Sequence, residues 1–176
     1  MFSVYENETE RCFARKTVEI LIFSDSHGAA SRMRQVITAH PDASHILFCG
    51  DGLSDLALVE KDLPVRVFLS VKGNCDGMLS FFDTPTERTV TLLGHRIVMM
   101  HGHTYGVKGS YGIAAAHAAE EGADILLFGH THIPYEGWLD VGEKRIQLFN
   151  PGSIGKGSYG VLTIRENGCL LSHGQI

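Results

Sequence analysis

Short, uninterrupted runs of apolar residues constrain the fold of this 176-residue chain more than any other feature of its sequence. In the first half they alternate with stretches whose apolar residues recur at helical spacing. Continuous Val, Ile, Leu and Phe is typical of strands buried on both faces, as in a parallel sheet fed by crossover helices. The expected elements are strands at 18–23, 45–49 and 65–71 and helices at 29–40 and 52–62.

The second half predicts hairpins, a third helix and further strands. Two apolar-rich runs flank Gly-His at 94–95 and predict an antiparallel hairpin that turns there. A helix is expected between an N-cap at Ser110 and a terminating Gly122. A second hairpin is expected to turn at Glu-Asn-Gly (166–168), since Asn-Gly favours tight turns. The strands expected here are 87–93, 96–100, 124–128, 144–149, 160–165 and 168–172.

These strands are too many for one sheet, so two stacked sheets with helices outside fit best. The chain is long enough to bury one sizeable core, and residues 17–176 are interpreted as a single domain. Residues 1–16 are polar and mixed in charge, and we interpret them as an N-terminal extension of unknown role. The predicted class is α/β (α+β), with two mixed sheets.

Charge and cysteine usage exclude several classes of protein. The net charge of −5 and pI of about 6.0 provide no basic field for nucleic acid or an acidic membrane. Residues 1–16 lack the apolar stretch of a signal peptide, and no later run reaches transmembrane length. Four cysteines without a CxxC pair are interpreted as reduced thiols: Cys12, Cys49, Cys75 and Cys169. We therefore expect a cytoplasmic protein without a membrane or nucleic-acid partner.

Side chains that can bind metal ions follow the last residue of five apolar runs. Ligands of open α/β sheets lie beyond the carboxyl ends of strands, and strand ends of a single sheet are neighbours. Each residue alone is more simply a turn, cap or surface residue, but five coincidences together favour a metal site. The candidate ligands are Asp25, His27, Asp51, Asn74, His101, His130 and His132.

Seven ligands are too many for one tetrahedral zinc ion and suit two ions that share a bridging ligand. Two divalent ions at about 3.5 Å repel strongly, so an anion must lie between them, and Asp51 is the natural bridging carboxylate. Two aspartates and a bridging hydroxide leave about one positive charge in excess, which suits a phosphate ester oxygen. Oxygen and imidazole ligands suit Mn²⁺, Fe²⁺, Zn²⁺, Ni²⁺ or Co²⁺, and Mn²⁺ is the ion we expect.

In their order along the chain, five motifs resemble those of the calcineurin-like metallophosphoesterases, and in particular their small prokaryotic phosphodiesterase branch. They are Asp-x-His (25–27), Gly-Asp (50–51), Gly-Asn-x-Asp (73–76), His-Gly-His (101–103) and Gly-His-Thr-His (129–132). The resemblance covers about residues 17–165. It implies a four-layer αββα sandwich of two mixed β-sheets flanked by helices, a two-metal site and hydrolysis of a phosphate ester. It also implies a first metal on Asp25, His27 and His132, a second on Asn74, His101 and His130, and Asp51 between them.

One position departs from the pattern of the larger family members. There a histidine that protonates the leaving group follows the ligand asparagine; here Cys75 does, as it often does in the small branch. A thiol of ordinary pKa, about 8.5, is a poor acid, so we interpret Cys75 as a packing residue or a support for the ligands. His103 is a candidate replacement acid or phosphate contact, or a histidine outside the ligand set. Asp76 could orient a neighbour or cap the turn, and Lys108 could add charge near the site or be solvated.

The activity expected is hydrolysis of a small-molecule phosphodiester by in-line attack of a metal-bridging hydroxide, with Asp51, Asn74 and His103 as catalytic residues. The missing histidine acid and the single excess charge favour diesters. A phosphomonoesterase or nucleotide phosphatase with the same site stays open. So does a catalytically weak scaffold like the retromer subunit of this fold. The complete ligand set favours an enzyme, and the oligomeric state is left open, a homo-oligomer included.

Overall fold

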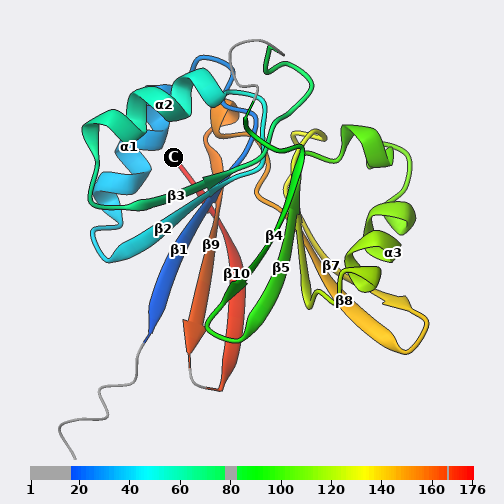
Figure 1. The fold of residues 1–176 in the computed structure, drawn as a ribbon. Helices are drawn as coiled ribbons and strands as arrows, with labels where there is room; N and C mark the ends of the chain where they lie inside the picture. The colour runs from blue at the N-terminus through cyan, green and yellow to red at the C-terminus, as the bar shows by residue number, and fades with distance from the viewer. Residues whose placement is uncertain (1–16, 78–82, 166) are drawn as a thin grey trace, which may run out of the picture.

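Two five-stranded sheets face each other in the computed structural model, which describes residues 17–77, 83–165 and 167–176. Helices cover the outer face of each sheet, so the layers run helix, sheet, sheet, helix (Figure 1). The predicted four-layer αββα sandwich is therefore confirmed. The proposed N-terminal extension, residues 1–16, lies outside the described residues, and the single-domain interpretation stays a prediction.

The first sheet has the strand order β10-β9-β1-β2-β3. Its three adjacent parallel strands are β1 (Val18–Phe23), β2 (Ala43–Phe48) and β3 (Val67–Ser70), and the hairpin of β9 (Ser158–Arg165) and β10 (Gly168–Gln175) adds antiparallel strands. The crossover helices α1 (Ala30–Ala39) and α2 (Leu53–Asp62) pack on its outer face. Met33, Val36 and Ile37 are fully buried there, as their helical spacing predicts.

The second sheet has the order β4-β5-β6-β8-β7 and is also mixed. Its strands are β4 (Glu87–Leu92), β5 (His95–Met100), β6 (Ile125–Phe128), β7 (Tyr135–Val141) and β8 (Lys144–Asn150). Helix α3 (Gly112–Glu120) covers its outer face. The helix ends as predicted at a glycine with positive φ: the N–H of Gly122 donates to the Ala119 carbonyl and that of Ala123 to the Ala118 carbonyl.

Apolar side chains fill three layers. The layer between the sheets contains Ile20, Ile22, Leu47, Met99, Leu127 and Phe149, all fully buried. The layer between the first sheet and helices α1 and α2 contains, among others, Phe23, Phe48 and Val59. The layer between the second sheet and helix α3 contains, among others, Met100, Ala115 and Phe128. The central strands are thus buried on both faces, which is why their sequences carry no polar alternation.

The N-cap predicted at Ser110 is wrong: helix α3 begins at Gly112 with Tyr111 as its N-cap, although the Ser110 hydroxyl accepts the Gly112 N–H (3.2 Å).

Two details of the predicted strands are also wrong. His95 is the first residue of β5 and pairs with Leu92, so the hairpin turns at Leu93 and Gly94, whose φ angles of 48° and 87° are those of a tight turn. Strand β7 was not predicted. It is an edge strand in which exposed and half-buried residues alternate, so it lacks the apolar run by which the other strands were found.

Two short 3₁₀ helices complete the described fold, η2 (His103–Tyr105) and η3 (Ile154–Lys156). The β9–β10 hairpin forms where expected, with Arg165 opposite Gly168, while its turn residue Glu166 lies outside the described residues. No helix in the described ranges is long and apolar enough to cross a membrane. Cys49, Cys75 and Cys169 are free thiols.

Candidate metal centre

The carboxyl ends of five strands meet at one edge of the sandwich, the upper edge in Figure 1. Strands β1, β2 and β3 belong to the first sheet, whereas β5 and β6 belong to the second. The expectation that a single sheet gathers the candidate ligands is therefore wrong. Both sheets contribute, and the side chains converge where the two layers meet.

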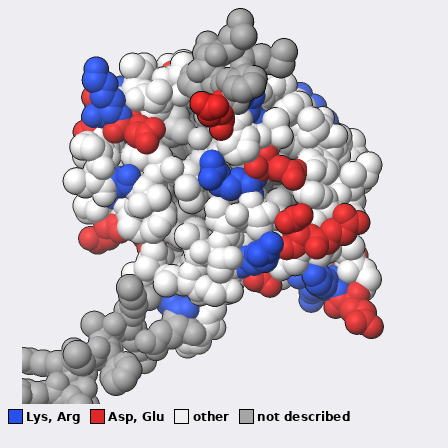
Figure 2. All heavy atoms as spheres, in the orientation of Figure 1, with Lys and Arg blue, Asp and Glu red and all other residues white. Residues whose placement is uncertain are grey.

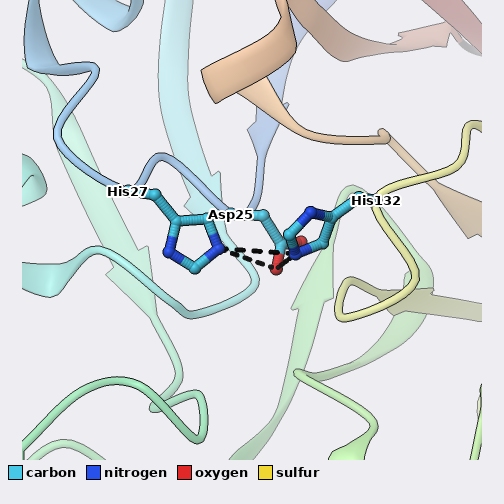
Figure 3. A group of neighbouring side chains, drawn as sticks. All are labelled: Asp25, His27 and His132. Atoms are coloured by element: carbon cyan, nitrogen blue, oxygen red, sulfur yellow. Dashed lines mark hydrogen bonds and ion pairs between the residues drawn. The ribbon is translucent and has the colours of Figure 1, made fainter.

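Asp25, His27 and His132 form one group of donor atoms (Figure 3). Oδ1 of Asp25 lies 3.1 Å from Nε2 of His132 and 3.8 Å from Nε2 of His27. The two imidazole nitrogens are 3.4 Å apart. All three atoms thus face a common point, as the resemblance implies for the first metal.

Asp25, Asp51 and His101 form a second group, joined by Asn74. Nε2 of His101 lies 3.2 Å from Oδ2 of Asp51, 3.1 Å from Oδ1 of Asn74 and 4.0 Å from Oδ1 of Asp25. Asp25, which follows β1, and Asp51, which follows β2, therefore both face the same buried histidine. Neighbouring donor atoms bound at 2.0–2.2 Å to one ion lie about 3–3.6 Å apart, which matches the two shorter of these spacings.

His130 and His103 lie beside this second group. The ring centroid of His130 is 5.0 Å from that of His101 and 6.1 Å from that of His103. The backbone N–H of His130 donates to Oδ2 of Asp25 (3.1 Å), which fixes the start of the Gly-His-Thr-His loop against β1. All seven candidate ligands and His103 are thus brought to one edge, while their binding of metal stays a prediction.

The backbone at these positions is strained. Asp25, His27, Asp51, His130 and His132 have φ between 43° and 66°, and among the described non-glycine residues only Leu93 shares this property. Asp and His tolerate the left-handed region better than most side chains, yet each such residue costs of order 1 kcal/mol. Strain gathered on five candidate ligands indicates that their positions are functional requirements rather than by-products of folding.

Two features show that the donors fit cations. Oδ1 of Asp25 is buried and has no hydrogen-bond partner among the described residues, although a buried carboxylate oxygen normally has one. Nδ1 of His101 lies 2.7 Å from the carbonyl of Cys49, so Nδ1 carries a proton, and Nε2 is the ring atom that faces the oxygen atoms of Asp51 and Asn74. A cation between these atoms would satisfy both, and carboxylate, amide and imidazole donors suit a divalent transition-metal ion.

Burial and mutual charge set the protonation of the site. Burial raises the pKa of Asp25, although the Ser24 hydroxyl and the neighbouring histidines oppose it. Burial would also raise the pKa of Asp51, but hydrogen bonds from His101 and the Cys75 N–H hold it below its usual range. Burial would lower the pKa of His101, yet Asp51 and Asp25 raise it. Burial lowers the pKa of His130 to about 4, with His101 and Lys108 adding to the effect, so this ring is neutral at pH 7.

Stability of the metal-free protein is expected to fall between pH 6.5 and 4, partly through His130. In this window the unfolded chain binds a proton on His130, whose ordinary pKa is about 6.5, while the folded chain does not until about pH 4. The unfolded state gains more protons, so the free energy of unfolding decreases as the pH falls. Urea unfolding with a chelator at pH 7 and pH 4.5 should show a smaller decrease for His130→Asn. Equal decreases in the two proteins would contradict this account.

Asp76 holds the backbone around two candidate ligands. Its buried carboxylate accepts four backbone N–H groups at 2.8–2.9 Å, those of Asp51, Gly52, Leu53 and Gly73. It therefore caps the start of α2 and ties the loop after β2 to the loop after β3. Of the roles weighed from the sequence, orienting a neighbour and capping a turn, the structure supports both.

Other polar residues that sequence reasoning missed fix the remaining loops. Oδ2 of Asp55 accepts the Ser26 hydroxyl (2.6 Å) and the Gly28 N–H (2.7 Å), which holds the loop of His27. Nδ2 of Asn150 donates to the Gly129 carbonyl (2.8 Å), next to His130. Asn150 ends β8, the same strand-end pattern that marked the ligands, so the sequence did contain a signal for it.

Cys75 is exposed, so it is not a packing residue. The side-chain amide of Asn74 donates to its Sγ (3.2 Å), and its backbone N–H donates to Oδ1 of Asp51 (2.7 Å). A hydrogen bond from the thiol to Asp51 raises the pKa of Cys75, with burial and acidic neighbours adding to it. The residue thus supports two candidate ligands as a protonated thiol, which agrees with the second interpretation drawn from the sequence.

The family model and two proteins that are similar to this chain carry phosphoesterase or phosphodiesterase names. Residues 18–167 match the family described as the calcineurin-like phosphoesterase superfamily domain. The chain is 31% identical over 157 residues to the probable metallophosphoesterase YsnB of Bacillus subtilis, covering 85% of this chain and 86% of that protein. It is 30% identical over 173 residues to the phosphodiesterase YfcE of Escherichia coli, covering 82% and 87%.

Solved structures share the fold. A predicted phosphoesterase from Streptococcus pneumoniae superposes with a TM-score of 0.71 at 26% identity, covering 92% of this chain and 91% of that one. Vacuolar Protein Sorting 29 from Cryptosporidium parvum superposes with a TM-score of 0.67 at 15% identity, covering 91% and 98%. At 15% identity, the similarity to Vacuolar Protein Sorting 29 shows a shared fold and nothing more.

Proposed function

Because this chain belongs to the calcineurin-like phosphoesterase superfamily, we propose that it is a two-metal phosphodiesterase acting on a small-molecule phosphate ester. The observation that carries the proposal is the unsatisfied, buried Oδ1 of Asp25, which lies between the imidazole of His27 from the first sheet and those of His101 and His132 from the second. A scaffold would have no need for an orphaned carboxylate oxygen, whose burial costs about 1–3 kcal/mol without a partner.

The donor set divides as the family resemblance implies. Asp25, His27 and His132 would hold one ion, Asn74, His101 and His130 the other, and Asp51 would contact both. When bound, two such ions supply Lewis-acid chemistry, neutralising charge on the phosphate and making water nucleophilic. We propose Mn²⁺ because oxygen and imidazole donors without thiolate suit it.

The protein's own groups prepare this site before substrate arrives. The Cys49 carbonyl fixes the ring of His101, and the Cys75 N–H fixes Asp51, so neither donor has to reorganise during the reaction. Burial lowers the pKa of His103, and its buried Nδ1 has no hydrogen-bond partner among the described residues. A neutral imidazole is a poor acid, so we propose that His103 contacts the phosphate rather than protonates the leaving group.

Diesters are proposed over monoesters for two reasons. The phosphodiesterase YfcE, 30% identical to this chain, carries that activity in its name. A site without a histidine acid after Asn74 also favours esters whose leaving groups depart without a proton.

We also propose a cytoplasmic location and a small-molecule substrate for this protein. Three free thiols suit a reducing compartment. Basic and acidic side chains intermix on the face shown in Figure 2, without an extended basic surface that would favour nucleic acid.

Removal of metal tests the proposed function directly. Protein stripped with a chelator is expected to hydrolyse bis(p-nitrophenyl) phosphate at the background rate, and added Mn²⁺ to restore at least about 100-fold activity. Zn²⁺, Ni²⁺, Co²⁺ and Fe²⁺ are assayed in turn, and p-nitrophenyl phosphate is expected to react at least about tenfold more slowly. Hydrolysis that is unaffected by metal removal would end the proposal.

A further inference from the structure

A cavity of about 340 Å³ adjoins the candidate metal centre on the side of His27 and His132. Both imidazoles form part of its wall, so a molecule bound to the first metal group would extend directly into it. The cavity is open to solvent, and polar side chains such as Ser153 and Lys156 share its wall with apolar atoms. Its lining residues are Ser26, His27, Gly28, Ala29, His132, Ser153, Gly155 and Lys156.

Two cationic side chains lie at this cavity. Lys156, the last residue of η3, lines it, and the guanidinium of Arg32 on α1 donates to the carbonyl of Gly155 in its wall. No carboxylate in the described ranges forms an ion pair with either one. Among the described lysines and arginines, the ion-paired ones are Arg34, Arg96 and Arg145, so unpaired cations also occur elsewhere and what distinguishes these two is their place at the cavity. In a chain of net charge −5, two cations left without acidic partners at one cavity form a local positive site.

The backbone that carries Lys156 is attached to the strand end that carries Asp25. The N–H groups of Ile154 and Gly155 donate to the carbonyls of Ser24 (3.0 Å) and Asp25 (3.3 Å). A Cβ on Gly155 would lie 3.0 Å from the Ser26 carbonyl oxygen and 3.1 Å from that of Asp25, so glycine permits this close approach. Lys156 is therefore held at a defined place relative to the first metal group.

We propose that this cavity binds a second anionic group of the substrate, a carboxylate or a further phosphate on an ester substituent, with Lys156 as its specificity-determining residue and Arg32 adding positive charge. The inference rests on the proposed function, since it takes the reacting phosphate to bind at the metal centre. A charge-assisted hydrogen bond to an ammonium group is the interaction that would select such a substituent over a neutral one. A cavity of this size is at the lower end of those that bind small molecules, which suits a short charged substituent.

Calorimetric titration of the Mn²⁺-loaded protein tests the proposal by binding rather than turnover. The ligands are ethyl phosphate, 2-carboxyethyl phosphate and 2-phosphoethyl phosphate. At low salt the two ligands with charged substituents are expected to bind about tenfold more tightly than ethyl phosphate, and less so as salt is raised. The stronger of the two identifies carboxylate or phosphate as the preferred group.

Three variants make the test specific. Lys156→Gln is expected to reduce the tenfold ratio to about one, and Lys156→Arg to retain most of it. Lys61→Gln removes the same charge from the far end of α2 and should keep the ratio. A ratio near one in the wild type, or an unchanged ratio in Lys156→Gln, would overturn the inference while the proposed function stands. If ethyl phosphate and both charged ligands fail to bind the loaded protein, the proposed function fails with it.

Discussion

Replacing Asp51 by asparagine is expected to lower hydrolysis of bis(p-nitrophenyl) phosphate at least about 100-fold and to reduce the bound metal in parallel. The carboxamide has the same shape and keeps an oxygen that can accept the Cys75 N–H, now 2.7 Å from Oδ1. What it would lose is the negative charge that we propose lies between two divalent ions, which would otherwise repel each other strongly. Elemental analysis and steady-state kinetics on one preparation measure both effects.

The matched control is Asp42→Asn. Asp42 is exposed and precedes β2, whereas Asp51 follows it, so the two residues flank opposite ends of the same strand. The control variant should keep wild-type activity and metal content. Urea unfolding in chelator should show that the Asp51 variant is folded, because the carboxamide oxygen can still accept the Cys75 N–H. Full activity in Asp51→Asn would contradict the assignment of Asp51 as a metal ligand.

Replacing Asp76 by alanine is expected to lower the free energy of unfolding by at least about 3 kcal/mol. Four backbone N–H groups would lose their acceptor, and three of them, on Asp51, Gly52 and Leu53, belong to consecutive residues. The loop after β2 would then separate from the loop after β3, and metal binding by Asp51 and Asn74 should weaken with it. Urea unfolding of the metal-free protein at pH 7 measures the loss.

Two further variants separate this effect from a general loss of charge. Asp76→Asn keeps one oxygen but turns an NH₂ group toward one pair of N–H donors, so an intermediate loss is expected, which stays measurable if the alanine variant does not fold. Asp62→Ala removes a half-exposed carboxylate that is paired with Arg34, a surface interaction of about 0–1 kcal/mol. A loss below about 1 kcal/mol in Asp76→Ala would show that water replaces the carboxylate.

The central strands and their order along the chain could be predicted because a strand that is buried on both faces has a continuous run of apolar residues in its sequence. β1, β2, β5 and β6 are such strands. β7 could not be found in this way, since an edge strand needs only one buried face and Trp138 on it is 52% exposed. The predicted position of the hairpin turn was one residue too far along the chain. The turn includes Leu93, which takes a left-handed conformation that its side chain does not favour.

The candidate ligands could be gathered from the sequence because each follows a strand end, a local signal. How they converge was not predictable in the same way, since the assignment of β5 and β6 to a second sheet depends on long-range pairing. The support from Asp55 depends on the Gly28 amide, 27 residues away, which no local pattern reveals. For Asp76 the sequence indicated a supporting role, but three of its four amide partners lie 23 to 25 residues away and could not be identified. Lys156 had no signal at all, because its place beside His27 and His132 arises only from the docking of η3.

The division of the donor atoms between the two sheets has a consequence for the integrity of the fold. Residues 17–77 supply Asp25, His27, Asp51 and Asn74, and residues 83–165 supply His101, His130 and His132. Ions held by both groups would act as a non-covalent cross-link between the halves of the sandwich, adding about 2.7 kcal/mol of stability at a free concentration 100 times the Kd. Metal starvation would then weaken the cohesion of the molecule as well as its chemistry, and expose it to proteolysis.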